Sequence, residues 1–88
     1  MDTISFEPQV GIYFGKPGQT RVVGSLDEAA ECLMSDSWPD HSGVAFKKSV
    51  DYLIAVAEGC ASANKGRLAF ADAAKEAGIL VERNPMMH

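Results

Sequence analysis

The feature that most constrains the fold of this chain is an alanine-rich segment between Ser62 and Gly78. Ser62 is a favoured N-cap residue and Gly78 a favoured helix stop, so the segment predicts a helix that runs to Ala77. Its large apolar residues are Leu68 and Phe70, and its other apolar side chains are alanines. Because most of these apolar side chains are small, a neighbouring helix or sheet can approach the helix closely. The sequence therefore predicts a layered fold with this helix inside it.

Two further helices are predicted before it. Ser25 with Glu28 has the capping-box spacing, which predicts a helix of about ten residues with apolar periodicity. Asp40 or Ser42 can cap a second helix, and Gly59 supplies its left-handed C-terminal residue. The apolar periodicity of this second helix is carried by Phe46, Val50, Leu53, Ile54 and Ala57.

The remaining segments predict strands. Residues 10–15 alternate between apolar and other residues, and residues 20–24 are rich in β-branched side chains. Between them, Pro17 and Gly18 suit the second and third positions of a type II turn, so the two strands form an antiparallel hairpin. Residues 79–81 predict a third strand.

The predicted order is thus ββαααβ, an α+β fold in which three helices pack on one face of a small, mainly antiparallel sheet. The 88 residues allow one core, and we assign residues 1–83 to a single domain. Residues 84–88 are predicted to be a disordered C-terminal tail. Trp38, held out of helical geometry by Pro39, is expected to close the side of the core.

The charge balance argues against nucleic-acid binding. Eight basic and twelve acidic residues give a net charge of −4, and the basic residues are scattered. Binding to phosphate backbones needs clustered lysine and arginine. A cluster of acidic residues in the first half of the chain either faces a basic partner protein or forms a solvated helix face. That group consists of Asp27, Glu28, Glu31, Asp36 and Asp40.

The spacing of the cysteines and the N-terminal residues indicate which metal sites and which cellular compartment to expect. Cys32 and Cys60 are isolated from each other and from histidine, so no zinc site and no other metal site is predicted. The chain starts without the features of a signal peptide and has no apolar run long enough to span a bilayer. We expect a cytoplasmic protein with reduced thiols and no membrane association.

Motifs for catalysis are weak. The segment from Gly11 to Gly18 lacks the spacing and the following helix of a phosphate-binding loop. Asp40, His41 and Ser42 are adjacent in sequence, which indicates a helix entrance more than a catalytic triad.

Four residues are candidates for an interaction or ligand site. His41 is a potential base, Cys60 precedes a predicted helix N-terminus, and Arg67 can anchor an anion. For Arg67 the alternative is a solvated arginine or an ion pair with a carboxylate such as Glu58 or Asp51, and for Cys60 a buried or merely tolerated thiol. The candidate residues are Trp38, His41, Cys60 and Arg67.

Three groups of residues resemble the small bacterial proteins grouped as domain of unknown function 982. They are Trp38-Pro39 followed by Gly43, the helix end at Glu58-Gly59, and the run from Arg67 to Ile79, which reads R-x-x-F-x-x-A-A-x-E-A-G-I. The likeness covers roughly residues 6 to 82. It implies a compact α+β cytoplasmic domain without an assigned activity or substrate. Relatives often carry a cysteine where this chain has Tyr52, which argues against shared cysteine chemistry there.

We therefore expect a non-enzymatic protein-binding or regulatory module that self-associates through exposed strand edges. No cofactor is expected. The alternative is a small-ligand binder or small enzyme in which Cys60, His41 and Arg67 surround one pocket.

Overall fold

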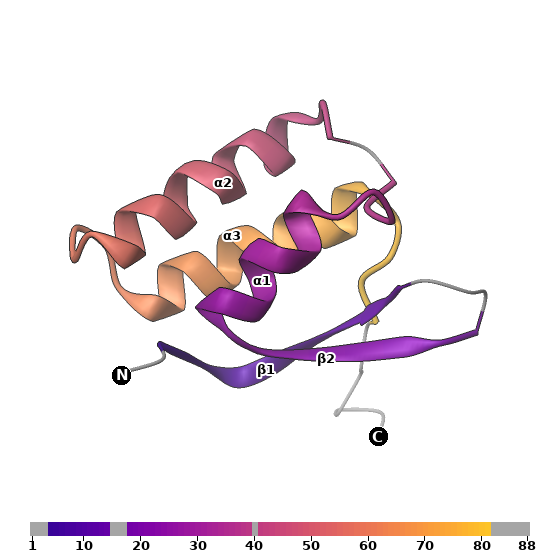
Figure 1. Ribbon diagram of the computed structural model, residues 1–88, viewed down its shortest axis with the longest axis horizontal. Coiled ribbons are helices and arrows are strands. Elements are labelled where there is room, and N and C mark those ends of the chain that lie inside the picture. Colours follow the sequence, from indigo (N-terminus) through magenta and orange to yellow (C-terminus); the bar gives the residue numbers. More distant parts are fainter. Residues whose placement is uncertain (1–3, 15–17, 40, 82–88) are drawn as a thin grey trace, which may run out of the picture.

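The computed structural model describes residues 4–14, 18–39 and 41–81. The predicted tail at 84–88 lies outside these residues. The two strands pair as an antiparallel hairpin, and Figure 1 shows the three helices on one side of it. The fold is therefore α+β. Its elements are β1 (Ser5–Tyr13), β2 (Thr20–Ser25), α1 (Leu26–Met34), α2 (Val44–Ala57) and α3 (Ala63–Glu76).

Local capping explains where α1 and α3 begin. The hydroxyl of Ser25 accepts a hydrogen bond from the Glu28 amide at 3.2 Å, and the Glu28 carboxylate accepts one from the Gly24 amide at 2.9 Å. The hydroxyl of Ser62 accepts in the same way from the Lys65 amide at 3.2 Å. Both predicted N-caps are confirmed, because each depends on residues within four positions of the helix start.

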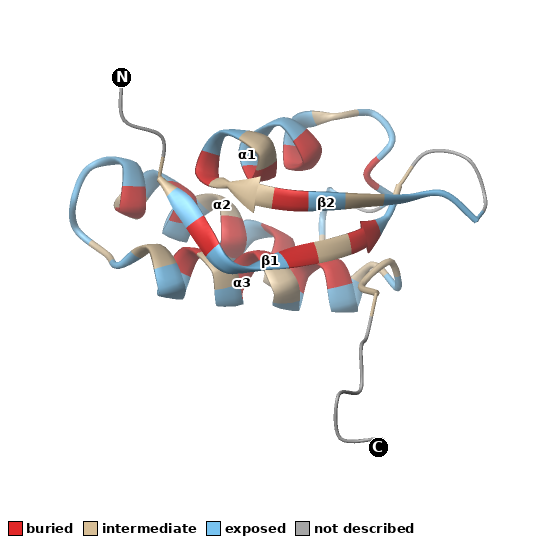
Figure 2. Ribbon diagram, turned by 90° about the horizontal axis from the view of Figure 1, so that it is seen from below, coloured by how far each residue is buried: buried red, intermediate tan, exposed pale blue. Residues whose placement is uncertain are grey.

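The hairpin is longer than its sequence pattern predicts. β1 begins at Ser5, and its side chains at Phe6, Val10 and Ile12 are buried. Between the pairs Ser5 with Ser25 and Val10 with Val23 the register is irregular, so residues 6–9 interrupt the two-residue alternation that marks a strand. The predicted start at residue 10 is wrong for this reason. Figure 2 shows several buried bands along β1 and a single one, at Val23, along β2.

The third strand predicted at residues 79–81 is a single bridge. Ile12 pairs with Leu80, the Tyr13 amide donates to the Ile79 carbonyl at 2.7 Å, and the Val81 amide donates to the Gly11 carbonyl at 2.9 Å. The contact extends over three residues of β1, which is too short for a strand. Among the described residues the order is therefore ββααα, in place of ββαααβ.

The helices form two levels above the hairpin. α1 packs on β2 and α3 packs on β1, whereas α2 packs on α3 and α1 and lies farther from the strands (Figure 1). A row of aromatic rings crosses these levels. Phe6 is 6.4 Å from Phe70, Phe70 is 5.6 Å from Trp38, and Trp38 is 6.3 Å from Phe46, centroid to centroid. Trp38 is 1% exposed, so its predicted place in the core is confirmed.

Candidate functional site

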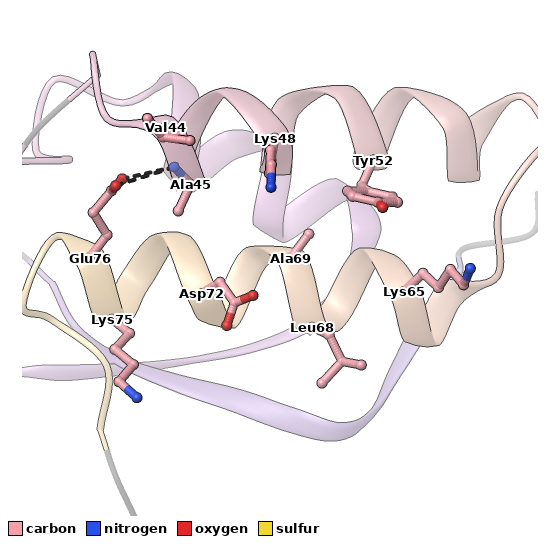
Figure 3. A pocket seen from close by; sticks show the side chains of 10 residues that line it. All are labelled: Val44, Ala45, Lys48, Tyr52, Lys65, Leu68, Ala69, Asp72, Lys75 and Glu76. Atoms are coloured by element: carbon pink, nitrogen blue, oxygen red, sulfur yellow. Dashed lines mark hydrogen bonds between the residues drawn. The ribbon is translucent and has the colours of Figure 1, made fainter.

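A groove of about 670 Å³ runs between α2 and α3 (Figure 3). It lies on the outer surface of the helix pair, with α1 and the hairpin behind it. We call it the α2–α3 groove. The residues that line it are Val44, Ala45, Lys48, Tyr52, Lys65, Leu68, Ala69, Asp72, Lys75 and Glu76.

Small residues let the two helices come close beneath the groove. Gly66 of α3 is buried, and a Cβ built on it would lie 2.9 Å from Val56 Cγ2 of α2. Ala69 is also buried between the helices. The closest approach is therefore at a glycine, where the absence of a side chain leaves room for Val56. The larger side chains that line the groove come from both helices.

Glu76 closes one end of the α2–α3 groove by capping α2 from another helix. Its two carboxylate oxygens accept hydrogen bonds from the Ala45 amide at 3.1 and 3.2 Å, and Oε1 also accepts from the Phe46 amide at 3.3 Å. The first amides of a helix have no acceptor within that helix, and the helix dipole places partial positive charge at this end. Both effects favour a carboxylate there. A Cβ built on Gly43, the N-cap residue, would collide with Glu76 Oε1.

This arrangement corrects the predicted start of α2. We expected Asp40 or Ser42 to cap it, but the N-cap is Gly43, which has no capping side chain. Asp40 lies outside the described residues. The cap is supplied by Glu76, more than thirty positions away in sequence, and so no local pattern indicates it.

The walls of the groove are apolar and positively charged. Val44, Tyr52 and Leu68 are large apolar side chains that are 69%, 41% and 48% exposed. Lys48, Lys65 and Lys75 add three positive charges, against Asp72 and the Glu76 carboxylate already bound to α2. Among the described residues the one ion pair within 4 Å is Arg21 with Glu31, at 3.2 Å on another face. The groove lysines therefore keep charge available for a ligand.

The four candidate site residues are not brought together. Trp38 is buried in the core, and His41 is exposed before α2, with Nε2 3.0 Å from the Ser35 carbonyl and its ring edge-on to Phe46 at 5.2 Å. Cys60 is exposed beyond the other end of α2. The fourteen residues of α2, about 21 Å of helix, separate His41 from Cys60.

Arg67 lies in a different depression, a cleft of about 620 Å³ beside β1. Its Nη2 donates to Asn64 Oδ1 at 2.7 Å, and it forms no ion pair with Glu58 or Asp51, one of the alternatives considered for it. Its Nε is buried and has no partner among the described residues. The cleft is lined by Pro8, Gln9, Val10, Gly11, Thr20, Val22, Arg67, Ala71, Leu80 and Val81.

The other chemical groups contribute to packing. Cys32 is fully buried in α1, and loss of hydration raises the pKa of its thiol; the Arg21 charge opposes this, and Glu31 and Glu28 add to it. Cys32 is thus a protonated packing residue at neutral pH. Within 4–14, 18–39 and 41–81, no group of three or more His, Cys, Asp or Glu side chains is placed to hold a metal ion.

The sequence did not single out the residues of the α2–α3 groove. Val44, Lys48 and Tyr52 recur every four positions on one face of α2, and Leu68 of α3 lines the same groove. That four-residue spacing could have indicated a shared binding surface, but it also fits a solvated helix face. The groove depends on how two helices are rotated against each other, which periodicity within one helix does not determine.

Comparison with known proteins gives a family match. The family described as Protein of unknown function (DUF982) matches residues 10–81. No curated protein and no solved structure matches the chain. In the part of the chain that the structure describes, each helix is too short or too polar to cross a membrane.

Proposed function

The chain belongs to the family described as Protein of unknown function (DUF982), and because that description assigns no activity, we propose from the geometry that it is a non-enzymatic protein-binding module. The observation that carries this proposal is the α2–α3 groove. It exposes Val44, Tyr52 and Leu68 along its length, although the domain has a core in which other apolar side chains are buried. Apolar side chains that gather on a surface and are rimmed by charge are typical of interaction sites.

The chemistry of the groove supports binding more than catalysis. Catalysis by side chains needs a nucleophile or a base held within hydrogen-bond reach of a reacting group. Cys60 and His41 line neither depression, and Arg67 lies in the cleft beside β1. The alternative of a small enzyme or ligand binder needs these three side chains around one pocket, so it gains no support from the geometry.

Site-specific photo-crosslinking tests this proposal. A photoreactive phenylalanine analogue at Tyr52 lies in the groove, and the same analogue at Ile54, also exposed on α2 but outside the groove, is the matched control. In cells that express the protein naturally, we expect protein adducts from position 52 and few from position 54. Equal yields from both positions, or no protein adduct from position 52, would overturn the proposal.

Self-association is a second candidate function, favoured by the hairpin. Among the described residues β2 pairs with β1 alone, so its other edge carries no strand. Tyr13 and Val22, 48% and 55% exposed, lie on the face away from Val10 and Ile12. An unpaired edge beside an apolar sheet face suits pairing with a second copy. We place this binding in the cytoplasm because both cysteines are free thiols.

Light scattering over a concentration series tests self-association. We expect the mass to rise above 9.4 kDa with concentration, and Val22→Lys to suppress the rise by placing a charge on the sheet face. Leu68→Lys is the matched control, because it adds the same charge on the groove face. A strict monomer at all concentrations would rule this second function out.

A further inference from the structure

We propose that the occupant of the α2–α3 groove is an acidic amphipathic helix of a partner protein. This inference rests on the proposed function and specifies its partner by secondary structure, length and charge.

The walls of the groove favour a helix over an extended peptide. Both walls are helices, whose interior amides and carbonyls are already bonded within the helix. An extended peptide would find no backbone partners there, unlike at a sheet edge. A helix satisfies its own backbone bonds and presents side chains alone. The groove therefore fits the mode in which an amphipathic helix lies between two others.

The spacing of apolar side chains sets the length of the occupant. Val44 and Tyr52 are eight residues apart on α2, about 12 Å at 1.5 Å per residue. Leu68 lies on α3 at the same end of the groove as Tyr52, with its side chain on the outer side of α3 (Figure 3). Apolar residues seven or eight positions apart on a partner helix span about 10 to 12 Å and can reach both ends. The occupant thus needs about three helical turns.

The lysines specify the charge of the occupant. Lys48 lies one turn from both Val44 and Tyr52, so it meets the middle of the partner helix. Lys65 and Lys75 lie toward the two ends of α3. Against these three charges stand Asp72 and Glu76, and the Glu76 carboxylate is engaged with the α2 amides. Three lysines against two carboxylates leave the groove with a net charge of +1 on a chain whose net charge is −4, so it favours an acidic helix over a basic one.

Binding of two designed peptides to the full chain tests the proposal. Each peptide has about twelve residues, alanine as background and leucine at positions i and i+7, with either glutamate or lysine between and beside the leucines. Fluorescence anisotropy of the labelled peptides gives the affinities. We expect the glutamate peptide to bind about tenfold or more tightly than the lysine peptide, with the difference shrinking at high salt.

Charge variants on α2 locate the binding. Lys48→Glu should weaken the glutamate peptide about tenfold, whereas Lys47→Glu, the same change on the neighbouring residue outside the groove, should have little effect. Lys48→Gln, which removes the charge without reversing it, should give a smaller loss in the same direction. Circular dichroism would show whether Lys48→Glu disturbs folding. If it does, Lys48→Gln still tests whether the Lys48 charge contributes to binding.

The outcomes separate this inference from the proposed function. Equal affinity for the two peptides, binding of neither, or equal losses from Lys47→Glu and Lys48→Glu would each overturn the acidic helix as occupant. Loss of a dimer in Lys48→Glu but not in Lys47→Glu would identify a second copy as the occupant and overturn it as well. The proposed function has its own readout, because crosslinking at position 52 does not depend on the charge of the partner.

Discussion

Glu76 is the side chain that joins the two helices of the α2–α3 groove. It lies in the last turn of α3, where a carboxylate is unfavourable for its own helix. The same carboxylate lies at the N-terminus of α2, where it is favourable and bonds to the Ala45 and Phe46 amides. An acidic residue at the wrong end of one helix, together with a helix start that lacks a cap, is therefore a signal of capping between helices.

Removal of this cap should weaken the fold measurably. Glu76→Ala leaves the first amides of α2 without their acceptor, so we expect the free energy of unfolding to fall by about 1 kcal/mol. Urea denaturation monitored by circular dichroism measures the change. Asp72→Ala, which truncates an exposed carboxylate one turn earlier on α3, is the control and should be close to neutral. Equal effects of the two variants would show that the cap contributes nothing of its own.

Cys32 should make the fold sensitive to alkaline pH. Its folded pKa lies above 9.0, its ordinary value, chiefly because the thiol is buried. Between 9.0 and the folded pKa the unfolded thiol loses its proton while the folded thiol keeps it, so ionisation favours unfolding. The stabilisation is complete below pH 9.0 and is lost as the pH rises above it.

Denaturation curves at several pH values, with a reductant present, measure this loss. Cys32→Ala is expected to lower stability at pH 7 because it leaves a cavity, but also to flatten the decline above pH 9. The two proteins differ only at position 32, so the contributions of all other side chains cancel in the comparison. Parallel pH profiles for the two proteins would refute this account of Cys32.

At the scale of elements, α2 and α3 approach as closely as Gly66 and Val56 allow. Gly66→Ala improves helix propensity by about 1 kcal/mol, but its Cβ would meet the stiff side chain of Val56 at 2.9 Å. Overpacking costs about 1 to 3 kcal/mol, so the net effect in the natural chain should be destabilising. In a Val56→Ala background the collision is absent, and Gly66→Ala should stabilise. A double-mutant cycle by urea denaturation tests this reversal, and additive effects would contradict it.

The elements also show what the sequence determines. The starts of α1 and α3 were predictable because Ser25 and Ser62 each cap an amide three positions later. The first half of β1 was not, since Phe6 is placed by its contact with Phe70, distant in sequence. The cap of α2 and the groove likewise depend on α3. Of the candidate site, only the separate side chains were visible, because their juxtaposition arises from packing between helices.

At the scale of the whole molecule, α3 is the element on which the others converge. It packs on β1, α2 and α1, and its side chains at Phe70, Ala73 and Ala74 are at most 1% exposed. Phe70 contacts both Phe6 of β1 and Trp38, which follows α1. Opening α3 therefore disrupts contacts with every layer at once, whereas opening β2 disrupts its pairing with β1 and its contact with α1.

Hydrogen exchange should reveal this hierarchy. The amides of Phe70, Ala73 and Ala74 are expected to exchange only through global unfolding, so their exchange free energy should equal that from urea denaturation. Amides of β2 should exchange with a smaller free energy, through local opening of the hairpin. A destabilising substitution such as Glu76→Ala should lower protection of the α3 amides by its full effect and leave the fastest β2 amides unchanged. Faster exchange in the middle of α3 than in β2 would show that the hairpin, and not α3, holds the layers together.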